Sequence, residues 1–121
     1  MYRILVVDDV RDCADSLASV LSSMGNEVRT AYSSSGGLEV VGTFDPEVVF
    51  LDLTMPQMDG LQLGRLLRHR FPDITLVAIT GRSGEGGRVL ACGFDYYLVK
   101  PVDSEDLAAA LTCADRLRVS C

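Results

Sequence analysis

Five short apolar segments alternate along this chain with stretches of helical character, and this alternation limits the folds that the chain can adopt. The apolar segments are rich in Val, Ile, Leu and aromatic residues, as β-strands are. They lie at residues 4–7, 27–31, 47–51, 74–79 and 96–99. The first, third and fourth are almost continuously apolar, which is typical of parallel strands that helices cover on both faces.

The segments between these strands predict helices. Leu17, Leu21 and Met24 recur at helical spacing, and Gly25 is expected to end that first helix. Further helices are expected over residues 35–43, 60–70 and from residue 104, after an N-cap at Asp103 or Ser104. Before the fifth strand, residues 81–87 include four glycines, so a fourth helix there is expected to be short or frayed.

Strict alternation of strand and helix predicts an α/β fold of the doubly wound type. We expect a flavodoxin-like (βα)5 arrangement, with a five-stranded parallel sheet in the strand order 2-1-3-4-5. The chain has 121 residues, a length that suits one domain over residues 1–121. No linker or internal repeat beyond the strand–helix unit interrupts the pattern.

Charge and cysteine usage exclude several classes of function. The 17 acidic and 11 basic residues give a net charge of −6, which disfavours direct binding to nucleic acid or to an anionic membrane. The first apolar segment is too short for a signal peptide or a membrane span, so a cytoplasmic location is expected. The four cysteines form no C-x-x-C pair, and we expect ordinary thiols rather than a zinc or redox site.

Polar residues stand where four of the predicted strands end. Asp8 and Asp9 follow the first strand, Asp52 the third, Thr80 the fourth and Lys100 the fifth. Ligands of open parallel sheets bind beyond the carboxyl ends of the strands. In the strand order 2-1-3-4-5 the three carboxylates meet in one pocket, where they repel one another unless a cation binds. Oxygen ligands of this kind suit Mg²⁺ or Mn²⁺.

The hydroxyl and the ammonium at this edge suit a phosphoryl group. A phosphoryl group on a carboxylate presents oxygens that a metal ion, the Lys100 ammonium and the Thr80 hydroxyl can bind. Pro101 restricts the backbone of Lys100 and is expected to fix the turn that directs this lysine inward. Taken singly, each Asp could cap the helix that follows it, but three acids at adjacent strand ends favour a binding site.

Five segments in this order and spacing resemble the receiver domain of two-component response regulators, over essentially the full chain. They are residues 4–9, residues 48–60, residues 78–81, Tyr97 and the pair Lys100 and Pro101. The combination is far more specific than any one of its motifs. Lys100 follows Thr80 by 20 positions, about two fewer than is usual in the family, and the shortening falls in the glycine-rich segment.

The resemblance implies that Asp52 is the phosphoacceptor, supplied by a histidine kinase, a histidine phosphotransfer protein or a small acyl phosphate. It also implies an Mg²⁺ site, with Mn²⁺ as a substitute. Asp9, Asp52 and the backbone carbonyl of Thr54 would ligate the metal, and Asp8 would act through a metal-bound water. The chain would then be a phosphoacceptor that assists its own phosphorylation and dephosphorylation, rather than an enzyme.

The resemblance also assigns roles in switching. Lys100 and Thr80 would stabilise the phosphoryl group, and Thr80 and Tyr97 would move together as the switch. Thr54 and Arg82, two positions after Asp52 and Thr80, would flank the attacking water and so modulate the dephosphorylation rate. The altered surface would change binding to a downstream protein or output domain, whose identity the sequence leaves open.

Two other functions share the predicted fold. A flavodoxin-like nucleotide- or flavin-binding module needs glycines or hydroxyls after the first strand, where this chain has Asp8 and Asp9. A phosphohydrolase with an aspartyl nucleophile usually needs a second acid two residues after it, and that position is Thr54. The domain is expected to be either free-standing or part of a larger protein. Residues 93–103 resemble receivers that are joined to hybrid histidine kinases.

Overall fold

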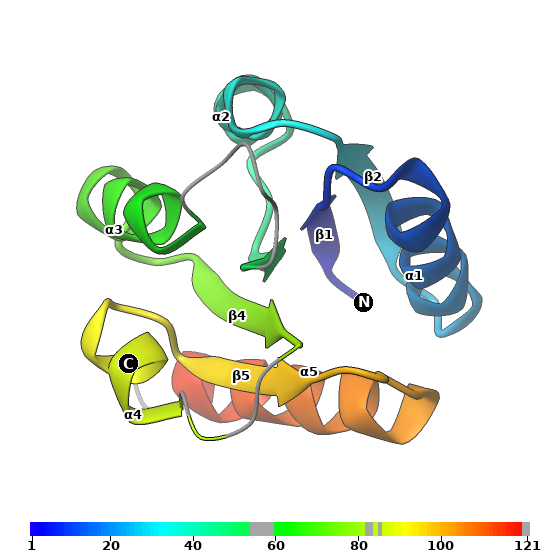
Figure 1. Cartoon of the computed structure of the whole chain (residues 1–121). Coiled ribbons are helices and arrows are strands. Elements are labelled where there is room, and N and C mark those ends of the chain that lie inside the picture. Colours follow the sequence, from blue (N-terminus) through cyan, green and yellow to red (C-terminus); the bar gives the residue numbers. More distant parts are fainter. Residues whose placement is uncertain (54–59, 82–83, 85, 120–121) are drawn as a thin grey trace.

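The computed structural model describes residues 1–53, 60–81, 84 and 86–119, and its five strands form one parallel sheet (Figure 1). The strands are β1 (Arg3–Val7), β2 (Glu27–Ala31), β3 (Val48–Asp52), β4 (Thr75–Thr80) and β5 (Tyr96–Val99). Their order in the sheet is β2-β1-β3-β4-β5, and every neighbouring pair is parallel. The predicted fold class and strand order are therefore confirmed.

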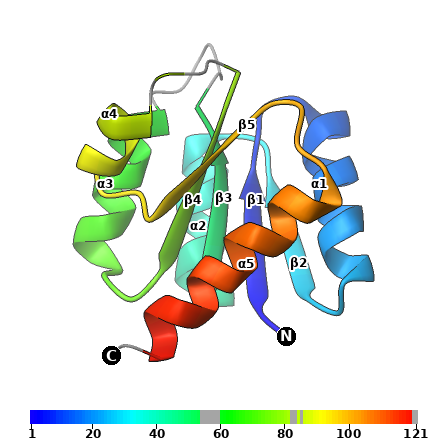
Figure 2. The same ribbon diagram turned by 90° about the horizontal axis from the view of Figure 1, so that it is seen from below.

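Helices connect the strands and cover both faces of the sheet (Figures 1 and 2). They are α1 (Arg11–Ser23), α2 (Ser34–Phe44), α3 (Gly60–Arg70), α4 (Gly86–Ala91) and α5 (Ser104–Val119). The buried side chains form two clusters, one from α2, α3 and α4 and the other from α1 and α5. None of the helices in the described ranges has the length and apolarity needed to span a bilayer.

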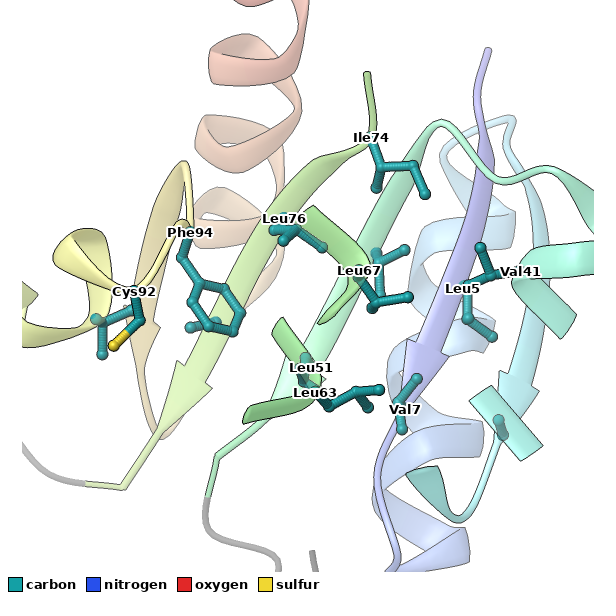
Figure 3. Packing of buried hydrophobic residues seen from close by; sticks show 14 residues of the cluster. Leu5, Val7, Val41, Leu51, Leu63, Leu67, Ile74, Leu76, Cys92 and Phe94 are labelled. Atoms are coloured by element: carbon teal, nitrogen blue, oxygen red, sulfur yellow. The ribbon is translucent and has the colours of Figure 1, made fainter. Parts of the chain in front are cut away.

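Successive residues of the central strands enter opposite clusters. In β1, Leu5 and Val7 pack under α2 and α3, whereas Ile4 and Val6 pack under α1 and α5. Figure 3 shows the first of these clusters, in which Leu67 of α3 lies over the sheet. All residues of β3 and β4 are buried. This burial on both faces is why their sequences are apolar without the alternation of a half-exposed strand.

Local signals set several of the helix ends. Asp103 caps α5, because its Oδ1 accepts a hydrogen bond from the Asp106 N–H at 2.9 Å, and Asp106 Oδ2 accepts one from the Asp103 N–H at 3.1 Å. Gly25, with a φ of 93°, follows α1 as expected. The fourth helix is short, as predicted. It begins at Gly86 and has six residues.

One helix is anchored at the end of the sheet opposite to the strand carboxyl ends. The Arg68 guanidinium of α3 donates to the backbone oxygens of Gly93, Pro72 and Ile74, at 2.8 to 2.9 Å. It also pairs with the Asp95 carboxylate, which accepts the Leu76 N–H at 2.8 Å. These contacts tie α3 to the starts of β4 and β5. Arg68 is therefore a structural residue whose N–H donors are used within the fold.

Three predicted strands have bounds that are wrong by one residue, and two of these strands concern the site. β1 begins at Arg3 rather than at residue 4, and β3 begins at Val48 rather than at residue 47. β4 covers Thr75–Thr80 rather than residues 74–79, and β3 ends at Asp52 rather than at residue 51. The ladder continues because the Leu53 N–H donates to the Ile79 carbonyl at 2.8 Å and the Lys100 N–H donates to the Thr80 carbonyl at 2.8 Å. Asp52 and Thr80 are thus held by strand geometry rather than by loops.

Candidate functional site

Asp52 is a buried acid at the centre of the sheet. It is the last residue of β3, which lies between β1 and β4, and only 3% of its surface is exposed. A carboxylate so far from water needs a partner of opposite charge. Lys100 provides it, with its Nζ 2.9 Å from the Asp52 Oδ2. Two of the residues that were predicted at this edge of the sheet are therefore in direct contact.

Asp8 lies beside Asp52, at the end of the neighbouring strand. Its N–H donates to the Ala31 carbonyl of β2 at 3.1 Å, and its Oδ1 accepts the Val10 N–H at 3.0 Å, so both backbone and side chain are fixed. Only 7% of Asp8 is exposed. Burial, together with the charge of Asp52 and a hydrogen bond between the two carboxyl groups, raises the pKa of Asp8 to about 6.

Lys100 reaches the carboxyl pair from the loop after β5. Its side chain is 38% exposed, and the Lys100–Pro101 peptide bond is cis. Burial alone would lower the pKa of Lys100, but the hydrogen bond and charge of Asp52, with a smaller contribution from Asp8, raise it above its ordinary value. The ammonium therefore stays charged beside Asp52 at neutral pH, where it can also meet an incoming anion.

Thr80 completes the edge of the sheet next to Asp52. It is the last residue of β4, it is 1% exposed, and its carbonyl accepts the Lys100 N–H. This backbone contact joins the end of β4 to the loop that carries Lys100. The sequence prediction that Thr80 and Lys100 act at one strand edge fits this arrangement.

The predicted metal ligands are described only in part. Asp9 is half-buried and follows Asp8, and Thr54 lies outside the described residues. Within those residues no group of three or more His, Cys, Asp or Glu side chains has the arrangement of a metal site. The structure thus brings Asp8 and Asp52 together but does not show Asp9 as a third member. Two buried carboxyl groups in contact still fit a hard divalent cation, which would relieve their repulsion.

The predicted switch residue Tyr97 lies in β5, the strand at one edge of the sheet. It is 37% exposed and pairs with Ala78 across the β4–β5 ladder. Its ring lies against Gly86, the first residue of α4, where an added Cβ would be 2.4 Å from the ring Cζ. A residue with a side chain at position 86 would therefore have to displace the Tyr97 ring. Arg82, the second predicted rate modulator, lies outside the described residues.

An apolar groove beside the site was missed from the sequence. It runs between α1 and α5, has a volume of about 790 Å³, and reaches both Asp8 and Lys100. Leu17, Val20 and Leu107 line its wall. The apolar face of α1, on which Val20 is exposed, is the feature of the sequence that could have indicated this groove.

This arrangement is suited to nucleophilic chemistry at one oxygen. Asp52 presents a carboxylate that is fixed by the sheet and has a cation at 2.9 Å. A second carboxyl group lies beside it, and a hydroxyl-bearing residue ends the next strand. Such a site can hold an anionic group that is bonded to Asp52 while Lys100 balances the added charge.

The sequence matches the family model described as "Response regulator receiver domain" over residues 4–112. The chain is 39% identical over 111 residues to response regulator MprA of Mycobacterium ulcerans, a match that covers 90% of this chain and 48% of the relative. The chain thus spans about half the length of the curated relatives that it matches.

Solved structures of isolated receiver domains have the same fold. The CheY-like receiver domain protein of Methanospirillum hungatei has a TM-score of 0.90 and 28% identity, and the match covers 100% of this chain and 99% of that one. A receiver domain protein of Clostridium thermocellum has a TM-score of 0.89 and 29% identity, with full coverage of both chains. NtrX of Brucella abortus is similar at a TM-score of 0.90 and 27% identity over 98% of this chain, which covers 28% of NtrX.

Proposed function

This chain belongs to the response regulator receiver family of two-component signalling, and we propose that it accepts a phosphoryl group on Asp52. The observation that carries the proposal is the buried Asp52 carboxylate, paired with Lys100 at 2.9 Å and in contact with Asp8. A merely structural ion pair would not need a second carboxyl group with a raised pKa beside it. Such crowding is costly unless an incoming ligand uses it.

In the proposed reaction, an Asp52 oxygen attacks the phosphorus of a phosphohistidine in line. The new bond joins the Asp52 oxygen to phosphorus, the phosphorus–nitrogen bond breaks, and the imidazole leaves with the bonding electron pair. A small acyl phosphate reacts in the same way and releases its carboxylate. The protein contributes mainly position and charge, since Lys100 balances the oxygens of the transferred group.

The residues present fit a divalent cation such as Mg²⁺, with Mn²⁺ as a substitute. The carboxylates of Asp9 and Asp52 and the Thr54 carbonyl would hold it, and Asp8 would contact it through water. When bound, the metal neutralises charge on the phosphoryl oxygens. Asp8 must lose its proton to contact the metal through water, and with a pKa of about 6 it loses this proton below neutral pH.

We expect the donor to be a histidine kinase or a histidine phosphotransfer protein. Such a donor must bring a reactive imidazole to Asp52, and the apolar groove between α1 and α5 leads to Asp8 and Lys100. An apolar face of the donor could cover Leu17 and Val20 while its histidine reaches Asp52. The corresponding location is the cytoplasm, and direct contact with nucleic acid or membrane is not part of the proposal.

Phosphorylation would act on partners by biasing two arrangements of the β4, α4 and β5 surface. The Thr80 hydroxyl would turn toward the phosphoryl oxygens, and Tyr97 would leave its place against Gly86. Thr54 and Arg82 would set the lifetime of the acyl phosphate by controlling access of water. The downstream partner is a protein or an output domain.

The proposal is tested by incubating the chain with acetyl phosphate and Mg²⁺ and measuring the intact mass. We expect one phosphoryl group to be added to the native chain and none to the Asp52→Asn variant, which keeps the shape of the site but lacks the nucleophile. Addition at Asp8 or Asp9, or no addition to the native chain, would contradict the assignment. Multiple turnover on phosphate esters would instead indicate a phosphohydrolase.

A further inference from the structure

One segment of this acidic chain contains more basic than acidic residues. Residues 60–92 contain five arginines and two acidic residues, a net charge of +3, although the whole chain carries −6. This segment includes α3 and α4, which lie side by side along one edge of the molecule (Figures 1 and 2). Such an asymmetry creates a local positive potential that the net charge conceals.

A cleft lies between these two helices. It has a volume of about 500 Å³ and is lined by Leu61, Gln62, Arg65, Arg88, Ala91 and Cys92. Arg65 comes from α3 and Arg88 from α4, and both side chains are exposed. The two guanidinium groups therefore line one cleft from different helices, and none of its six lining residues is acidic.

One guanidinium group is oriented by the lining of the cleft. Arg65 Nη2 donates to the Sγ of Cys92, a buried residue, at 3.5 Å. A thiol is a weak acceptor, and guanidinium has five N–H donors, so this contact uses little of the donor capacity of Arg65. Arg68, one turn further along α3, differs because its donors are used by the anchor to Asp95 and the backbone.

The lining combines these cations with apolar surface. Leu61 is half-buried, and Ala91 and Cys92 add small apolar groups. Guanidinium binds planar carboxylates with two parallel hydrogen bonds. A free phosphate ion would leave the apolar part of the cleft uncovered. A long polyanion such as nucleic acid would extend beyond the cleft over a chain that is negative overall.

We propose that the α3–α4 cleft is a docking site for an acidic segment of a partner protein, which places carboxylates on Arg65 and Arg88 and an apolar side chain near Leu61. Charge complementarity selects this occupant, and a cleft of about 500 Å³ accommodates side chains rather than a whole helix. The proposal depends on the charge and shape of the cleft and does not require phosphorylation of Asp52.

The test is an NMR titration of the ¹⁵N-labelled full chain with a short peptide of alternating leucine and glutamate. We expect saturable shifts of amide signals in residues 61–65 and 88–92. The peptide in which glutamine replaces glutamate should bind at least about tenfold more weakly, because it cannot form charge-assisted pairs.

Charge reversal provides the matched comparison. Arg65→Glu and Arg88→Glu should each weaken peptide binding by about tenfold, whereas Arg29→Glu on β2, an exposed arginine outside the cleft, should change it less than about twofold. Should a reversal variant fail to fold, Arg65→Gln and Arg88→Gln carry the same comparison.

The proposal would be overturned by equal binding of the two peptides, by shifts that map outside the cleft, or by unchanged affinity of the arginine variants. It would also fail if inorganic phosphate or a single-stranded oligonucleotide bound the cleft as tightly as the acidic peptide. Because none of these measurements involves phosphorylation, failure here leaves the role of Asp52 intact. Conversely, loss of phosphorylation in the Asp52→Asn variant leaves peptide binding unchanged.

Discussion

Replacing Asp8 by Asn should remove a pH-dependent loss of stability that native Asp8 causes. Burial and the neighbouring Asp52 raise the pKa of Asp8 from 3.8 to about 6. The folded protein therefore binds this proton more tightly than the unfolded chain between about pH 4 and pH 6. The free energy of unfolding must fall as the pH rises through that window, because ionised Asp8 is tolerated less well in the fold than in water.

The size of the effect follows from the shift. A difference of about two pKa units at about 1.4 kcal/mol each corresponds to about 3 kcal/mol, which is an order-of-magnitude upper value because Asp8 titrates together with Asp52. Asn is neutral and has the size of Asp, and its oxygen can still accept the Val10 N–H. We therefore expect Asp8→Asn to match the native chain near pH 4 and to be more stable above pH 6, by up to about 3 kcal/mol.

The assay is urea unfolding monitored by circular dichroism from pH 4 to pH 8, with EDTA to remove divalent ions. The difference between variant and native chain isolates Asp8, because titrations common to both cancel. Asp12→Asn, at an exposed acid in the first turn of α1, controls for the loss of one formal charge. Adding Mg²⁺ should stabilise the native chain at pH 7 but not at pH 4. A stability difference that stays constant from pH 4 to pH 8 would refute the reasoning.

Two further predictions concern the lysine and a close helix contact. Lys100→Met leaves the Asp52 carboxylate without its cation and should lower the free energy of unfolding by about 1 to 2 kcal/mol. This value is reduced for solvent screening because the lysine side chain is 38% exposed. Urea unfolding at pH 7 measures the effect, and an unchanged midpoint would contradict the pairing. Gly64→Ala places a Cβ 2.4 Å from the Phe94 ring and should cost about 1 to 3 kcal/mol despite a gain of up to about 1 kcal/mol in helix propensity. Gly42→Ala, where nothing lies within 4 Å, should instead raise the thermal midpoint, and an equal response of the two glycines would show that the close contact does not matter.

Much of the candidate site could be predicted because it depends on chain topology. Once the alternation of strands and helices indicates a parallel sheet, the carboxyl ends of its strands must lie at one edge. Asp52 and Lys100 are distant in the sequence, yet their strand-end positions were enough to predict that both lie at this edge, where the structure shows them in contact. The roles of Thr54 and Arg82 stay predictions, since both lie outside the described residues.

The amino-acid sequence alone determined the order and type of the elements, the buried faces of the strands and the residues at the strand ends, because these follow from local periodicity and from the geometry of a parallel sheet. Tertiary structure decided the features that depend on packing between distant elements. Tyr97 lies against Gly86, Arg65 shares a cleft with Arg88, and Asp8 holds its proton to about pH 6. Local sequence contains no record of such contacts, since they depend on which side chains the fold brings together and on how much water it removes from between them.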